Sequence, residues 1–142
     1  MTQSGAIKSF RFLDSPDVLD LPSDAKVAHI FGSASTKLEL LDAIAAALNF
    51  PGYFGRNWDA FWDCICDLSW LDAHTIAMVH DDIPRALPKF ELSTYVHTLA
   101  EAVVDWKPGE AHQLVVAFPA TCRQEVERIL ADRPDPKDRP PR

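Results

Sequence analysis

The sequence predicts an α/β fold, in which a three-stranded parallel sheet is packed with helices. Three apolar runs of strand length alternate with segments whose apolar residues recur at helical spacing. Strands that alternate with helices usually pair in parallel through right-handed crossovers. A length of 142 residues fits a single domain. The three predicted strands are Val27–Phe31, Thr75–Val79 and Leu114–Phe118.

The N-terminal part is expected to add an edge strand and a loop. Ile7–Leu13 has strand-like content with imperfect alternation, and Asp14–Asp24 holds two prolines and four aspartates. After the first buried strand, Thr36 and Glu39 have the spacing of a capping box, which predicts the start of a helix. The expected buried face of that helix holds Leu38, Leu41, Ala45 and Leu48.

The next helix is expected to run from Asn57 to about Trp70. Asn57 is a good N-cap, and Gly55 permits a sharp turn of the backbone just before it. Asp59 in the first turn is stabilised by the helix dipole. At about 100° per residue, one face carries Asp59, Asp63 and Asp67, flanked by Trp62 and Cys66. The opposite, buried face holds Ala60, Phe61, Cys64, Ile65 and Leu68.

The C-terminal half repeats the alternation. The apolar run at Thr75–Val79 is typical of a strand covered on both faces. A helix is expected over Leu92–Trp106, stopped by Pro108 and Gly109. An amphipathic helix over Thr121–Ala131 follows the last strand, and the proline-rich remainder is expected to be disordered. The residues expected to be buried by the first of these helices are Val96, Leu99 and Val103.

Composition and charge restrict the classes of partner. The net charge is −7, and six of the 14 Lys and Arg follow Phe118, so the preceding part is the more acidic. An acidic body argues against direct binding of nucleic acid and favours a basic protein partner, although such charge also serves solubility. No apolar run has the length of a membrane span, and the first residues lack the pattern of a signal peptide. With three cysteines, an odd number, we expect a cytoplasmic protein without disulfides.

No cofactor, metal site or catalytic residue is expected. Cys64 and Cys66 lack the second pair that a zinc site needs, and the histidines are scattered. Asp59 and Asp63 could form a carboxylate pair for acid–base chemistry, but no nucleophile or metal cluster accompanies them. They could also be the solvated face of an ordinary amphipathic helix. The aromatic residues beside Asp59 and Asp63 favour recognition of a partner over acid–base chemistry and over an ordinary solvated face.

The run Tyr53-Phe54-Gly55-Arg56-Asn57-Trp58-Asp59-Ala60-Phe61-Trp62-Asp63-Cys64 resembles the signature of the barstar-like family, founded on an intracellular inhibitor of the ribonuclease barnase. The resemblance implies a barstar-like domain over residues 24–118, with an N-terminal extension (1–23), a C-terminal helix (119–131) and a disordered tail (132–142). It also implies an inhibitor that blocks the active site of a basic ribonuclease, with carboxylates in the places of phosphates.

The resemblance assigns roles to single residues. Asp63 matches the aspartate that enters the enzyme's phosphate-binding cavity, Asp59 the one that contacts the basic rim, and Tyr53 the ring that stacks on the catalytic histidine. Arg56 stands where the founding member has an acidic residue, and Phe54 replaces a tyrosine, so the partner is expected to differ from barnase. The remaining partner-binding residues are expected to be Phe54, Gly55, Asn57, Trp62, Cys66, Asp67 and Glu101.

Two alternatives remain open. One is a barstar-like immunity or adaptor domain that binds a different basic toxin or enzyme. The other is a hydrolase that uses Asp59 and Asp63. The sequence leaves the oligomeric state of the free chain undecided.

Overall fold

The computed structural model describes residues 10–15, 19–52 and 54–132. They form one parallel sheet of four strands in the order β1-β4-β3-β2. The α/β fold with its three predicted parallel strands is therefore confirmed, and so is the added N-terminal edge strand, which pairs Phe10 with Val116. The strands are β1 (Phe10–Leu13), β2 (Lys26–Ile30), β3 (Thr75–His80) and β4 (Gln113–Pro119). The predicted strand residues 7–9 and the expected tail after 132 lie outside the described residues.

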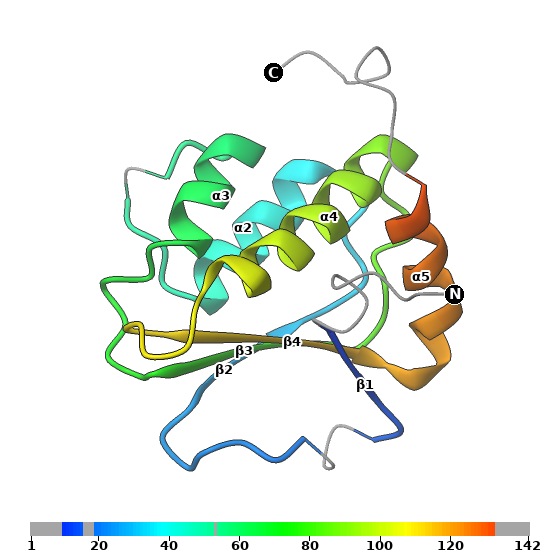
Figure 1. Ribbon diagram of the computed structural model, residues 1–142. Coiled ribbons are helices and arrows are strands. Elements are labelled where there is room, and N and C mark those ends of the chain that lie inside the picture. Colours follow the sequence, from blue (N-terminus) through cyan, green and yellow to red (C-terminus); the bar gives the residue numbers. More distant parts are fainter. Residues whose placement is uncertain (1–9, 16–18, 53, 133–142) are drawn as a thin grey trace.

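The helices cover one face of the sheet (Figure 1). They are α2 (Lys37–Ala47), α3 (Trp58–Ile65), α4 (Lys89–Asp105) and α5 (Arg123–Ala131), with a short 3₁₀ helix, η2 (Ala120–Cys122), before α5. The described part of the connection from β1 to β2 after residue 18 crosses the other face (Figure 1), where Leu19 and Leu21 pack against Ala77, Val79 and Val115. Both faces of β3 are thus buried, as its apolar sequence predicts, although helices cover one face alone.

The N-terminus of α2 follows the prediction, but its buried face does not. The capping box is present: the Glu39 amide donates to Thr36 Oγ1, and the Thr36 amide donates to Glu39 Oε1, both at 3.1 Å. Leu38, expected in the core, is 44% exposed, and Ala45 is half-buried. A face containing Ile44 removes more apolar surface from water than one containing Ala45. The buried residues are Leu40, Leu41, Ile44 and Leu48.

Helix α4 begins three residues earlier than predicted and carries a buried polar contact. Val96 and Leu99 are buried as expected, whereas Val103 is half-buried. Tyr95 also faces the core, where its hydroxyl lies 2.6 Å from His80 Nε2, and His80 Nδ1 lies 3.0 Å from the Ala117 carbonyl oxygen. A neutral imidazole that donates from Nδ1 and accepts at Nε2 satisfies both contacts. Burial lowers the pKa of His80 to about 4, against a weaker opposing effect of its bond to Ala117.

The predicted C-terminal helix is present as α5, which packs beside α4 with Val126 buried. Within the described residues, no helix is both long and apolar enough to cross a lipid bilayer.

Candidate functional site

Helix α3 begins where the sequence predicts, because the Asn57 side chain caps its N-terminus. The Asn57 backbone is extended, and its side-chain oxygen accepts a hydrogen bond from the Ala60 amide at 2.8 Å. The Asn57 N-cap is therefore confirmed, and Asp59 lies in the first turn. The Trp58 indole donates to Glu91 Oε1 of α4 at 3.0 Å, which ties the start of α3 to a second helix.

The expected end of α3 near Trp70 is wrong, because the helix ends at Ile65. The backbone turns at Leu68, which has a left-handed φ of 51°. Trp106 caps this end, because its indole donates to the Ile65 carbonyl at 3.0 Å. Trp70, which follows the turn, donates to the Leu48 carbonyl at the end of α2 at 2.9 Å. Cys66 and Asp67 thus lie in the turn after α3 and not on the helix.

The division of α3 into a buried and an exposed side is confirmed. Among the residues expected in the core, all but the half-buried Ala60 are at most 5% exposed. Asp59 and Asp63 on α3 are exposed, and so is Asp67 in the turn. The carboxylates are therefore presented by a helix that is packed from behind and held at both ends.

The loop before α3 turns at a different residue from the one expected. Gly55 does not adopt a left-handed conformation, and a Cβ there would lie 3.5 Å or more from its nearest neighbours. Arg56 takes the left-handed conformation instead, with φ of 59°. Its guanidinium holds both carboxylate oxygens of Asp42 on α2. The half-buried Phe54 packs edge-on against Phe50 at 5.0 Å between ring centres. Tyr53 lies outside the described residues.

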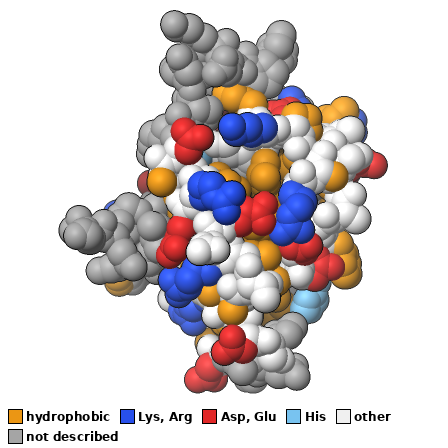
Figure 2. All heavy atoms as spheres, turned by 90° about the vertical axis from the view of Figure 1, so that its right-hand side faces the viewer, with side chains coloured by type: hydrophobic (Ala, Val, Ile, Leu, Met, Phe, Trp, Pro, Cys, Tyr) orange, Lys and Arg blue, Asp and Glu red, His pale blue; other side chains and the backbone are white. Residues whose placement is uncertain are grey.

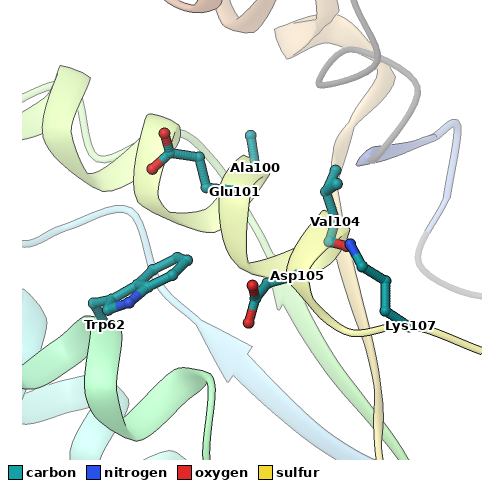
Figure 3. Close-up of a pocket in the computed structure, with 6 residues that line it drawn as sticks. All are labelled: Trp62, Ala100, Glu101, Val104, Asp105 and Lys107. Atoms are coloured by element: carbon teal, nitrogen blue, oxygen red, sulfur yellow. The ribbon is translucent and has the colours of Figure 1, made fainter. Parts of the chain in front are cut away.

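A surface hollow of about 460 Å³ lies between Trp62 of α3 and the C-terminal part of α4 (Figure 3). Trp62 projects from α3 toward α4, which contributes Glu101 and Asp105. The structure therefore brings Glu101 to the same hollow as Trp62. The sequence reasoning missed Asp105 and the half-exposed Val104. The four-residue spacing of Glu101 and Asp105, which places both on one side of a helix, is the signal that could have revealed Asp105.

Cys66 is a neutral member of this region. Burial, then the charge of Asp105 and a hydrogen bond to it, and the charge of Asp63 together raise the pKa of its thiol to about 12. A protonated thiol can donate a hydrogen bond, but it is a poor nucleophile and a poor metal ligand. In the described part of the chain, no three His, Cys, Asp or Glu side chains come together as a metal site would need.

The carboxylates on this side define a surface that we call the acidic face. Arg56, at its border, is paired with Asp42, and the Lys107 ammonium donates to the Val104 carbonyl oxygen at 2.6 Å. The side of the molecule at α5 differs, because basic and acidic side chains are interleaved there (Figure 2), as in the ion pair of Arg85 with Glu125 at 2.9 Å. The acidic face consists of Asp59, Asp63, Asp67, Glu101 and Asp105, of which Glu101 and Asp105 line the hollow together with Trp62.

Two comparisons with known proteins bear on this site. A family model described as "Barstar (barnase inhibitor)" matches residues 25–119. A Bacillus subtilis (strain 168) protein named "Putative ribonuclease inhibitor YrdF" is 33% identical over 78 residues, which cover 54% of this chain and 75% of that protein. The span matched by the family model includes α3, the loop before it and α4, and it leaves out β1 and α5.

Proposed function

This chain belongs to the barstar family, and we propose that it inhibits a basic ribonuclease by laying the acidic face over the enzyme's active site. The observation that carries the proposal is the rigid presentation of exposed carboxylates beside Trp62 by a helix fixed at both ends. A surface that is already ordered loses little conformational entropy when it binds.

The mechanism is mimicry of the RNA backbone. A ribonuclease binds phosphates with basic side chains, and carboxylates that enter the same cavity complete the same charge-assisted hydrogen bonds. Asp63 occupies the centre of the proposed contact, Asp59 contacts its basic rim, and Glu101 adds a contact across the hollow. The excess of negative charge also steers a basic enzyme toward the face before contact.

The other proposed partner-binding residues differ in how they contribute. The Asn57 side chain is committed to the Ala60 amide, so it acts by fixing α3. Cys66 offers a protonated thiol, and Gly55 leaves the backbone open to close approach. Tyr53, Phe54, Trp62 and Asp67 complete the proposed set.

Two described elements outside the matched residues, β1 and α5, pack on the matched part of the chain. Because β1 pairs with β4 and α5 packs on α4, we treat residues 1–23 and 119–131 as additions to a barstar-like domain at 24–118. The three cysteines of the chain are free, which suits a reducing compartment. We therefore propose that the protein is cytoplasmic.

A second candidate is an immunity or adaptor domain for a basic toxin that is not a ribonuclease. Arg56 favours this candidate, because it places a basic side chain, paired with Asp42, beside the acidic face, where the founding member of the family has an acidic residue. A partner that differs from barnase is therefore expected. We propose no hydrolase activity, since the Cys66 thiol near Asp63 is held protonated and no three possible metal ligands come together among the described residues.

Titration of enzyme activity tests the proposal. The chain is added to barnase and to a panel of basic bacterial ribonucleases, and cleavage of a fluorogenic RNA substrate is followed. For the cognate enzyme, activity should fall linearly to zero at one equivalent. Tight binding of a non-ribonuclease toxin, with every ribonuclease unaffected, would favour the second candidate instead.

A further inference from the structure

The ion pair of Arg56 with Asp42 joins the loop before α3 to α2. Arg56 Nε lies 2.8 Å from Asp42 Oδ1, and Nη2 lies 2.8 Å from Oδ2. Two parallel hydrogen bonds between a guanidinium and a carboxylate form the most directional ion pair available to side chains. The pair therefore specifies an orientation of the loop as well as a distance.

The backbone conformation of Arg56 sets the direction in which the chain enters α3. A left-handed φ of 59° is unfavourable for a residue with a Cβ, so contacts elsewhere must hold it. The next residue is the N-cap Asn57, and Asp59 follows within the first turn. A rotation of the backbone at Arg56 would therefore move the start of α3 and the first carboxylate of the acidic face.

The charge of Arg56 is also unfavourable at this place. Between Pro51 and Ile65 the sequence has no other Lys or Arg. Arg56 immediately precedes the N-terminal end of α3, where the helix dipole repels a cation. Unpaired, it would oppose the attraction of the acidic face for a basic protein. Asp42 neutralises it in a pair whose side chains are about half exposed, at 51% and 53%.

We propose that the Arg56–Asp42 ion pair is a latch with two effects on inhibition. It positions the start of α3, and it prevents the basic side chain of the loop from weakening the acidic face. Arg56 is thus a positioning residue that acts through Asn57 and Asp59. The inference rests on the proposed function, because the second effect requires a basic partner.

Four variants separate the two effects in stopped-flow binding to the inhibited ribonuclease at low salt. Arg56→Gln removes the latch and its positive charge, so dissociation should be roughly two- to fivefold faster, the range for an exposed ion pair, with association unchanged or faster. Asp42→Asn breaks the latch but leaves the cation, so dissociation should accelerate similarly and association should slow about twofold. The double variant should dissociate no faster than either single one and regain the association rate. Arg56→Lys keeps the charge without the paired geometry, so it should change dissociation alone.

The free chain provides a measurement that needs no partner. Amide hydrogen exchange over residues 54–59 should accelerate about two- to fivefold in Arg56→Gln and in Asp42→Asn. Glu127→Gln, which removes the exposed Arg123–Glu127 pair on α5, is the matched control and should leave this exchange and the binding rates unchanged.

Each contrary outcome has a distinct meaning. If Arg56→Gln weakens binding while Asp42→Asn changes nothing, Arg56 contacts the enzyme directly and the latch is refuted. Unchanged exchange in both variants refutes the positioning effect. If the unsubstituted chain binds no ribonuclease, the proposed function fails together with the electrostatic effect, and the exchange measurement still decides the positioning effect.

Discussion

Replacing Asp63 with alanine should weaken ribonuclease binding far more than it changes folding. Asp63 is exposed on α3 and lies one turn after Asp59, a carboxylate of the same sign. Removing an exposed charge away from caps and core contacts changes the free energy of unfolding by about 0.5 kcal/mol or less. Its loss also relieves some repulsion from Asp59, by roughly 0.2–0.5 kcal/mol.

The cost in the complex is larger because the partner's basic groups would be buried without a counter-charge. Removing one member of a buried ion pair costs about 3–5 kcal/mol. At about 1.4 kcal/mol for each tenfold change, Kd should rise between about a hundredfold and several thousandfold. Asp63→Asn should lose nearly as much, since it keeps the shape of the side chain but not its charge.

The assay compares Kd by stopped-flow or calorimetric titration with Tm by circular dichroism. Asp24→Ala is the matched control, because it removes an exposed aspartate from the turn before β2, in the connection that crosses the helix-free face of the sheet. The control should bind within about twofold of the unsubstituted chain. Normal binding by Asp63→Ala would refute the role of the acidic face, and an unfolded Asp63→Ala would show that the aspartate has a structural role.

Three further measurements follow from charge and burial. The association rate should fall steeply with rising salt while dissociation changes little, and Asp59→Asn with Asp67→Asn should flatten this dependence; a salt-independent rate would contradict steering. Because burial lowers the pKa of His80 to about 4, the neutral imidazole stabilises the fold above pH 6.5, and stability should decrease as pH falls from about 6.5 to 4, by up to about 3 kcal/mol. Urea unfolding across this pH range should show the decrease in the free energy of unfolding. The double variant His80→Leu with Tyr95→Phe should lack the part of this decrease that comes from His80. Because burial and Asp105 raise the pKa of Cys66 to about 12, iodoacetamide at about pH 8 should modify it far more slowly in the folded chain than in urea; equal rates would contradict its burial.

The strands and the helix starts could be predicted because short segments determine them. Apolar runs identify β3 and β4, which are buried on both faces. The capping box at Thr36 and the N-cap at Asn57 are satisfied by atoms within three residues, so the starts of α2 and α3 need no knowledge of the rest of the chain.

The end of α3 could not be predicted, because distant residues determine it. Trp106 is 41 positions away from the Ile65 carbonyl that it caps. The turn at Leu68 has no glycine to signal it. The buried face of α2 was ambiguous for another reason: its closely spaced apolar residues are compatible with two neighbouring faces, and the fit to the core selects the one with Ile44.

In the candidate site too, features set by neighbouring residues could be predicted and features set by distant residues could not. The carboxylates of α3 follow from helical spacing, and Glu101 was expected from the family resemblance. Asp105 and the Arg56–Asp42 pair became apparent only when α4 and α2 were placed beside α3 and its loop. The sharp turn before α3 was expected at Gly55 because glycine permits it, whereas the left-handed residue is Arg56, whose side chain is held by Asp42, 14 positions earlier in the sequence.

Competition with a nucleotide tests most directly whether the acidic face occupies the active site of the enzyme. The affinity of the chain for its ribonuclease is measured at increasing concentrations of a nucleotide that binds the enzyme's phosphate site. If carboxylates take the places of phosphates, the apparent Kd should rise in proportion to nucleotide concentration, and Asp63→Ala should show a weaker dependence. A complex that holds the chain and the nucleotide together at undiminished affinity would contradict the account.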